Sequence, residues 1–168
     1  MNTKNNKRKR QSQESIENAF LNMLLEKELT QISVTDICNE TGLNRSTFYA
    51  NYIDIYDLAD KIRTKMESDF YNAFHDKPDN NGVKFFKHIY DNQILYRVYF
   101  KLNYKEKYPY IILDLTHSGI VFDDKYIDYH TEFFLSGITA VIKKWLGSGC
   151  KETPEEMADI IKSEYRGK

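Results

Sequence analysis

The stretch SVTDICNETGLNRSTFYANYIDIYDL, residues 33–58, places two short amphipathic segments on either side of one glycine. Ser33 and Asp36 have the spacing of a capping box, in which the serine hydroxyl accepts a hydrogen bond from the backbone amide three residues on. Gly42 tolerates the left-handed backbone conformation that ends a helix. The sequence therefore predicts a helix that ends near residue 41, a tight turn, and a second helix over about residues 44–52.

The second of these helices has an apolar side and a polar side. Phe48 and Tyr52 share one face, and Asn44 is placed to cap the helix. Around the outside we expect the hydrogen-bonding side chains of Arg45, Ser46, Thr47, Tyr49 and Asn51. A helix that follows a turn and another helix in this way can enter the major groove of DNA. Because arginine matches the acceptors of base edges there, Arg45 is our first candidate for reading a base.

Residues 33–58 resemble the helix-turn-helix of TetR/AcrR-type transcriptional regulators, whose hallmark is a Thr-Phe-Tyr-like run after a glycine turn. The resemblance covers about residues 12–60, including the preceding amphipathic helix and the long helix that links the DNA-binding and regulatory domains in that family. It implies that the side chains facing bases or adjacent phosphates are Thr35, Asn44, Arg45, Ser46 and Thr47. It also implies that Tyr49 and Asn51 touch the DNA backbone.

Three positions depart from the family pattern. Asn51 stands where many members have His, which leaves a donor in place, and Tyr52 stands where Phe is usual. Ile55 stands where many relatives place a Lys that pairs with phosphate, so the resemblance does not carry that contact over.

The first ten residues hold five cations and no acid, although the whole chain has a formal net charge of -1. Alone, such a run is a solvated, disordered tail. Beside a helix-turn-helix it can reach neighbouring phosphates or the minor groove. We therefore expect residues 1–10 to be a disordered basic arm in which DNA is contacted by Lys7, Arg8, Lys9 and Arg10.

The remaining sequence predicts an all-α fold, because only 7 glycines and 3 prolines interrupt it and apolar residues recur at spacings of three and four. Thr153-Pro154-Glu155-Glu156 combines an N-cap, a first-turn proline and a capping-box glutamate. Gly147 is expected to end the preceding helix. Beyond residues 33–52, we expect helices over about residues 12–27, from 55 to before Pro78, 83–92, 94–102, 109–121, 125–146, and from 154 onward.

We divide the chain into the arm, a DNA-binding domain of three helices (11–69), and a helical regulatory and dimerisation domain (70–168), joined by a long helix. The segment YHTEFFLSGITAVIKKWLGSGCKETPEEMADII, residues 129–161, resembles the C-terminal domain of DhaS-like regulators of Firmicutes. That resemblance implies a homodimer held by the last two long helices, and the excess of apolar residues between Phe133 and Trp145 agrees with it. The candidate interface residues are Phe134, Ile138, Val141, Ile142, Trp145, Ile160 and Ile161.

The regulatory segment is rich in Tyr and Phe between residues 85 and 110. A cavity lined by such rings can hold a small apolar or aromatic effector, and the candidate lining is Tyr90, Tyr96, Tyr99 and Phe100. Core packing explains these aromatic residues equally well.

Other functional classes find no support in the sequence. Cys38 and Cys150 are far apart, and the four histidines lack the spacing of metal ligands, so we expect no metal and no cofactor. No nucleophile elbow, phosphate loop or carboxylate pair indicates an enzyme. No apolar stretch is long enough to span a membrane, and the N-terminus is unlike a signal peptide, so the protein is expected to be cytoplasmic.

The sequence thus predicts a dimeric, sequence-specific regulator of transcription that binds a palindromic operator in double-stranded DNA. Repression is the default sign of regulation, with an effector sensed by the C-terminal domain. One alternative is an activator that works with a protein coactivator. Another is a helical protein-interaction module that has lost DNA binding, which Ile55 and the near-neutral charge favour.

Overall fold

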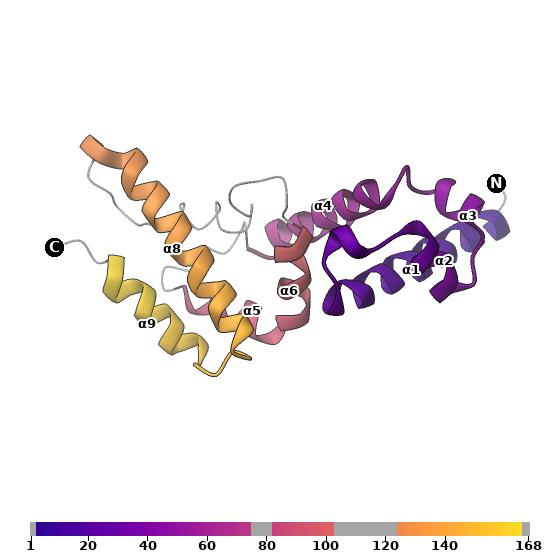
Figure 1. The fold of residues 1–168 in the computed structure, drawn as a ribbon. Coiled ribbons are helices and arrows are strands. Elements are labelled where there is room, and N and C mark those ends of the chain that lie inside the picture. The colour runs from indigo at the N-terminus through magenta and orange to yellow at the C-terminus, as the bar shows by residue number, and fades with distance from the viewer. Residues whose placement is uncertain (1–2, 75–81, 103–123, 166–168) are drawn as a thin grey trace. The chain divides into compact units, whose positions relative to one another are not determined.

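The computed structural model describes residues 3–74, 82–102 and 124–165 (Figure 1). Across these ranges the chain is helical with short connections and contains no strand, which confirms the predicted all-α fold class. The first helices are α1 (Thr3–Glu26), the 3-10 turn η1 (Leu29–Gln31), α2 (Val34–Thr41), α3 (Arg45–Tyr49) and α4 (Ile55–Phe74). They are followed by α5 (Val83–Asp91), α6 (Gln93–Leu102), η3 (Asp124–Tyr126), α8 (Ile127–Gly147) and α9 (Pro154–Tyr165). The helix predicted over residues 109–121 lies outside the described residues.

The chain forms two compact units, Met1–Met66 and Glu67–Lys168. Their boundary and the domain boundary expected from the sequence both fall within the long helix α4.

Helix α1 begins much earlier than the sequence analysis expected. It starts at Thr3, so the predicted disordered basic arm is helical from that residue onward. Lys, Arg and Gln are good helix formers, and no glycine or proline interrupts the segment. An ion pair one turn apart, Arg10 Nε to Glu14 Oε1 at 3.5 Å, also favours the helix.

The first unit is built around the apolar stripe of α1. Ile16, Phe20 and Leu24 are fully buried at helical spacing, and α1 packs against α2, which in turn packs against α3. Phe48 of α3 and Leu58 of α4 are completely buried in the same unit. Burial of each such side chain contributes about 1.5–3 kcal/mol to stability.

The predicted turn between α2 and α3 is confirmed. Ser33 Oγ accepts from the Asp36 amide at 3.2 Å, and Asp36 Oδ2 accepts from the Ser33 amide at 2.9 Å. Ser33 Oγ also donates to Asp36 Oδ2 at 2.6 Å, and this hydrogen bond, together with the one from the Ser33 amide, holds the pKa of Asp36 below its usual value. Gly42 has a φ of 68°, in the left-handed region. Asn44 occupies the N-cap of α3, but its side chain makes no capping hydrogen bond.

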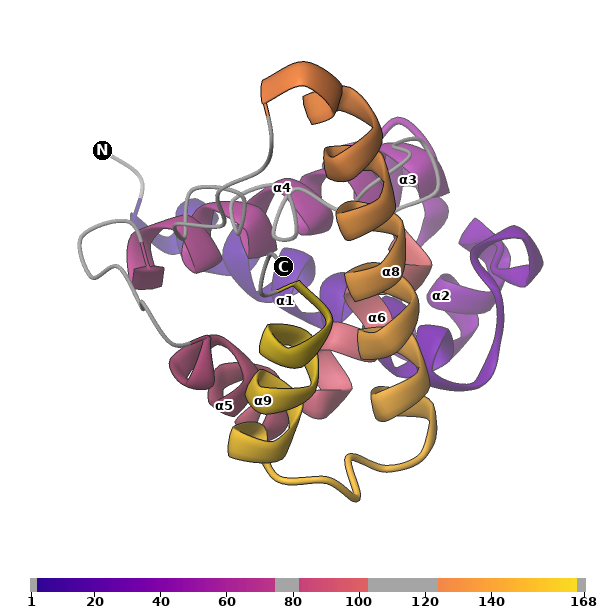
Figure 2. The same cartoon turned by 90° about the vertical axis from the view of Figure 1, so that its left-hand side faces the viewer.

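In the second unit, α5 packs against α9 and α6 packs against α8 (Figure 2). Thr153 and Glu156 form the predicted capping box at the start of α9, with hydrogen bonds of 2.7 and 3.2 Å. Helix α8 ends at Gly147, as the sequence predicts, and the left-handed conformation is taken two residues later by Gly149, with a φ of 83°. Cys150 then donates from its amide to the Trp145 carbonyl at 2.9 Å, which closes the helix end.

Two absences hold for the described ranges. No helix there combines the length and the apolar character that crossing a membrane requires. Nor do three or more His, Cys, Asp or Glu side chains come together there as a metal site would need.

Candidate nucleic-acid interface

Helix α3 has only five residues and is held in place by its inner face. The Phe48 ring is fully buried and contacts the rings of Tyr49 and Tyr52, each at 5.6 Å between centroids. The buried Tyr52 hydroxyl donates to Glu17 Oε1 of α1 at 2.9 Å. Because these contacts fix one face of α3, the opposite face is presented to solvent.

The exposed edge carries most of the residues that the sequence analysis selected for DNA binding. The exposed members of that set are Thr35, Asn44, Arg45, Ser46 and Tyr49, and the half-buried members are Thr47 and Asn51. Tyr49 keeps half of its surface exposed although its ring touches Phe48. The edge is therefore polar and hydrogen-bonding, with an aromatic side chain at its centre.

Arg45 is oriented by two neighbours. Its Nη1 donates to Thr35 Oγ1 and its Nη2 donates to the Tyr49 hydroxyl, both at 3.4 Å. The hydrogen bond to Tyr49 raises the pKa of Arg45, so the guanidinium stays charged. A guanidinium that is held by one edge of its fork keeps other N–H groups for a ligand.

Asn51 has a structural task that the sequence did not reveal. Its Nδ2 donates to the Thr47 carbonyl at 2.8 Å, and this gives a hydrogen-bond partner to a carbonyl near the C-terminal end of α3. Its Oδ1 is buried and makes no hydrogen bond. One amide proton of Asn51 is thus committed to the helix end.

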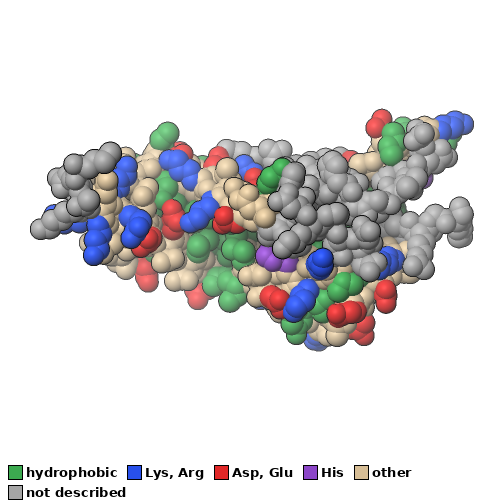
Figure 3. Space-filling model, turned by 180° about the vertical axis from the view of Figure 1, so that it is seen from behind, with side chains coloured by type: hydrophobic (Ala, Val, Ile, Leu, Met, Phe, Trp, Pro, Cys, Tyr) green, Lys and Arg blue, Asp and Glu red, His purple; other side chains and the backbone are tan. Residues whose placement is uncertain are grey.

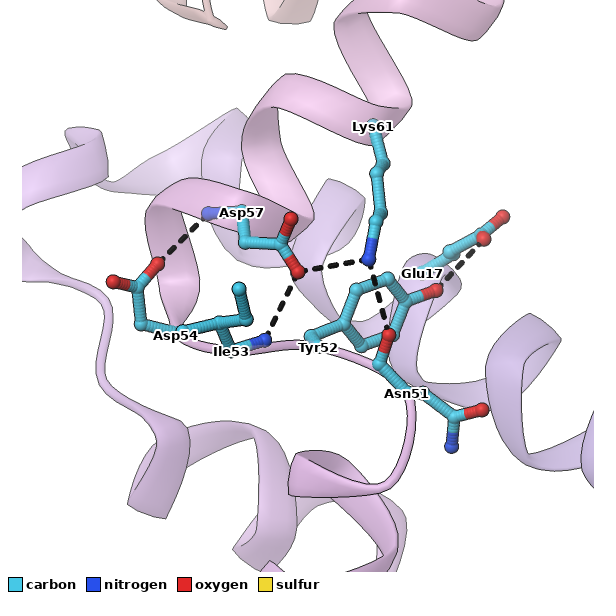
Figure 4. A network of polar contacts seen from close by, with 7 residues as sticks. All are labelled: Glu17, Asn51, Tyr52, Ile53, Asp54, Asp57 and Lys61. Carbon is cyan, nitrogen blue, oxygen red and sulfur yellow. Dashed lines mark hydrogen bonds and ion pairs between the residues drawn. The ribbon is translucent and has the colours of Figure 1, made fainter.

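The start of α4 is acidic and internally paired (Figure 4). The Asp57 amide donates to Asp54 Oδ1 at 2.8 Å, and Asp57 Oδ2 accepts from the Ile53 amide at 2.9 Å. Lys61 Nζ lies 2.8 Å from that same Asp57 oxygen and 3.2 Å from the Asn51 carbonyl. Lys61 and the Ile53 amide hold the pKa of Asp57 below its usual value.

Ile55 opens α4 at the position where the family resemblance led us to look for a phosphate-binding lysine. Its side chain is 7% exposed and belongs to the core of the unit. A basic side chain is therefore absent from this position, and the neighbouring carboxylates of Asp54 and Asp57 favour cations rather than phosphates.

A solvent-open hollow of about 570 Å³ separates the start of α1 from α3. On the α1 side it is lined by Asn6, Arg8, Lys9 and Ser12. On the other side it is lined by Ser46, Thr47, Ala50 and Asn51. The lining contains two cations and no acid.

The four basic residues that were predicted to contact DNA have different surroundings in the structure. Arg8 and Lys9 line the hollow, whereas Arg10 pairs with Glu14 at 3.5 Å and Lys7 is exposed. Lys and Arg side chains gather where the chain begins, at the left of Figure 3. Asn6 and Ser12 of the lining were not anticipated, because the residues with which they line the hollow, Arg8 and Lys9, lie in the part of α1 that the sequence analysis expected to be disordered.

A family model described as "Transcriptional regulator C-terminal region" (TetR_C_8) matches residues 76–164. The chain belongs to the TetR family of transcriptional regulators. This family assignment confirms the one drawn from the sequence.

Solved structures share the fold of this TetR-family regulator. A TetR transcriptional regulator from Streptococcus agalactiae 2603V is 22% identical with a TM-score of 0.73, over 96% of this chain and 97% of that one. The dihydroxyacetone kinase operon activator DhaS is 19% identical with a TM-score of 0.54, over 92% of this chain and 93% of that one. No curated protein matches in sequence.

In the second unit of this TetR-family regulator, the candidate effector residues have packing roles. Tyr96 and Tyr99 are buried, and the Tyr99 hydroxyl donates to Glu67 Oε1 at 2.9 Å. Phe100 lies under Lys143 Nζ at 5.4 Å, and Tyr90 lies against Trp145 with 6.2 Å between ring centroids. Tyr96 and Tyr99 therefore belong to the core, whereas Tyr90 is 41% exposed and Phe100 is half-buried, and an effector site on these residues stays a prediction.

The candidate dimer residues divide into two groups. Phe134, Ile138, Ile142 and Trp145 are at most 2% exposed within the single chain, so they form its core and offer little surface to a partner. Val141 and Ile161 are half-buried, and Ile160 is exposed. Apolar spacing alone does not distinguish a contact within the chain from one between chains.

Two large exposed aromatic residues of α8 were missed in that selection. Tyr129 and Phe133 are 77% and 72% exposed, on the side of α8 away from the buried residues. Their spacing of four residues could have indicated a second apolar face on this helix.

Proposed function

We propose that this TetR-family regulator is a cytoplasmic homodimer that binds a palindromic operator, inserts α3 into the major groove, and reads a base with Arg45. The observation that carries the proposal is the division of α3 into a buried Phe48 and an exposed polar edge on which Arg45 is held at 3.4 Å by Thr35 and Tyr49. Arginine paired with guanine is the commonest specific contact in the major groove.

The other exposed side chains of this edge are suited to positioning contacts. Hydroxyl and amide groups donate to phosphate oxygens, which sets the register of a recognition helix without reading sequence. Ser46 and Thr47 supply such hydroxyls, Thr35 and Asn44 flank them, and Asn51 retains one amide proton, while the Tyr49 hydroxyl holds Arg45. We assign DNA recognition to residues 11–69 and regulation and dimerisation to residues 70–168.

The proposed dimerisation is supported by the exposed apolar side chains of the last two helices. Tyr129 and Phe133 on α8 and Ile160 on α9 are large, exposed and apolar, and an apolar surface of this kind is typical of a protein interface. We propose that a second copy covers them, with Val141 and Ile161 at the margin. A twofold dimer presents two recognition helices, which fits an operator of two inverted half-sites.

The test is a selection experiment with the purified protein of residues 1–168. Duplexes that the protein enriches from a random library should share an inverted repeat, and their affinity should fall steeply with salt. A protein-interaction module without DNA binding would enrich no sequence. Absence of both a motif and a salt-dependent duplex complex would overturn the proposal.

Repression is the proposed sign of regulation, with an effector or partner that acts on residues 70–168 and lowers operator affinity by favouring another arrangement of the helices. The alternative is activation with a protein coactivator, and the similar DhaS structure is that of an operon activator. Transcription in vitro from a promoter that carries the selected operator decides the sign. If the protein is a repressor, the amount of transcript should fall as the protein is added. A rise in transcript would support the activator alternative.

A further inference from the structure

We propose that the hollow between α1 and α3 is a binding site for one phosphate of the DNA backbone, contacted by Arg8 and Lys9 from one side and by Ser46 and Thr47 from the other. The proposal rests on the proposed function and adds the place where the DNA strand is held. The hollow has a volume of about 570 Å³, and no carboxylate is among its lining residues.

The geometry of α1 selects two of its cations for this site. Residues four apart share a helix face, so Arg8 and Ser12 lie together, and Lys9 lies beside them. Arg10 points elsewhere and pairs with Glu14 at 3.5 Å. The same helix continues into the buried Ile16, so the cations are carried by a helix that is anchored in the core rather than by a loose arm.

The geometry of α3 gives the other wall of the site. Arg45 and Tyr49 are four residues apart and share the edge proposed to read bases. Ser46 and Thr47 lie on the next face, where they line the hollow together with Ala50 and Asn51. When Arg45 and Tyr49 enter the major groove, Ser46 and Thr47 therefore face one of the two DNA strands that border this groove. A phosphate on that strand can be contacted from both walls.

The start of α4 makes this placement more favourable. Ile55 is buried there, and the carboxylates of Asp54 and Asp57 accept the amides at the helix start. Lys61 is engaged with Asp57 at 2.8 Å. A phosphate at that point would meet two acids, whereas the hollow offers two cations and hydroxyl donors. The strand is therefore held at α1.

The experiment measures the affinity of the protein of residues 1–168 for its selected duplex as a function of salt. Arg8→Gln and Lys9→Gln are made singly and together, with Lys65→Gln as the matched control. Lys65 is an exposed cation of α4 that pairs with Glu17 at 3.9 Å and does not line the hollow, and each single change removes one charge and keeps a good helix former. Because the hollow holds one phosphate, we expect the slope of log affinity against log salt to become shallower by about one in the double variant, with part of that change in each single variant. Lys65→Gln should leave the slope unchanged, and the selected sequence should be the same for all variants.

A second measurement locates the contact on the DNA. Methylphosphonate linkages, which remove the charge of one phosphate, are placed in turn along the half-site. One position should weaken binding of the wild type and have no further effect on the Arg8→Gln/Lys9→Gln protein. Titration with inorganic phosphate should give no saturable binding, and saturation there would assign the hollow to free phosphate and overturn the proposal.

The outcomes separate this inference from the function on which it rests. If the wild type binds no duplex, both fail. If it binds a sequence whose recognition depends on Arg45, but Lys65→Gln changes the slope as much as Arg8→Gln and Lys9→Gln do, only the phosphate site is wrong.

Discussion

Tyr49 holds Arg45 before any DNA arrives, because the Tyr49 hydroxyl accepts from Arg45 Nη2 at 3.4 Å one turn along the same helix. Thr35 accepts from Nη1 at the same distance. A long, flexible side chain that is already oriented loses less conformational entropy when it binds. The pair therefore affects both the strength and the selectivity of base reading.

Replacing Arg45 with alanine should lower operator affinity by about 1–3 kcal/mol and relax specificity at one base position. The side chain is exposed, so the fold and the dimer should be unaffected. Gel shift or fluorescence anisotropy checks this prediction by measuring the affinities of both proteins for operators that are mutated at each position in turn. Equal affinities for wild type and variant on every operator would remove Arg45 from its role.

Replacing Tyr49 with phenylalanine removes only the hydroxyl that orients Arg45. We expect the free energy of operator binding to weaken by about 0.5–1.5 kcal/mol, which is the usual net value of one hydrogen bond. The loss should shrink markedly in the Arg45→Ala background, since two residues that act through one contact are not additive. A loss of the same size in both backgrounds would mean that Tyr49 acts without Arg45, for example through a phosphate.

Replacing Gly42 with alanine should destabilise the first unit by about 1 kcal/mol, because its φ of 68° is strained for a residue with a Cβ. An added Cβ meets no atom within 4 Å, so packing contributes nothing to the cost. Denaturant unfolding checks this, with Gly42→Asn as the control, since asparagine tolerates the left-handed conformation better. An alanine variant as stable as the wild type would contradict the assigned turn.

The first unit should lose stability at acid pH, because Asp57 becomes protonated there. Its pKa is lowered by Lys61 and the Ile53 amide, so the ionised carboxylate stabilises the folded state at neutral pH. That contribution is present above the ordinary Asp pKa of 3.8 and is lost as pH falls through the lowered value in the folded protein. Asp57→Asn should therefore be less stable at pH 7 and should lose less stability on acidification. Parallel stability curves for the two proteins between neutral and acid pH would count against this role.

Replacing Phe133 with glutamate should raise the dissociation constant of the dimer by about 100-fold, equivalent to about 3 kcal/mol. The side chain is 72% exposed in the single chain, so the fold should be kept. Sedimentation measures the association. Ile94→Glu on α6, where the side chain is 64% exposed, is the matched control and should remain dimeric. A dimer that tolerates the change at Phe133 would place the interface elsewhere.

The local features of this fold could be predicted from the sequence because a few neighbouring residues determine them. The capping boxes at Ser33 and Thr153 and the glycine turn at Gly42 each depend on residues no more than three positions apart. The resemblance to the TetR family likewise depends on a short segment, residues 33–58.

Long-range features could not be predicted in this way. The hydrogen bond from Tyr52 to Glu17 joins residues 35 positions apart, and no periodicity indicates it. Helix α1 begins earlier than its run of cations suggests, because the charge of a segment does not show whether it is helical, and Lys, Arg and Gln favour helix. Phe134 and Ile138 were assigned to a partner because apolar spacing does not tell which surface covers a helix.

The five residues of α3 are too few to persist as a helix in water, where even favourable sequences need about 12–15. An isolated peptide that spans the turn and α3 should be a random coil with no operator affinity. A synthetic mimic of this surface must therefore supply a rigid scaffold in place of α1, α2 and Phe48. For the same reason, heat or urea should abolish operator recognition at the same midpoint as it melts the first unit.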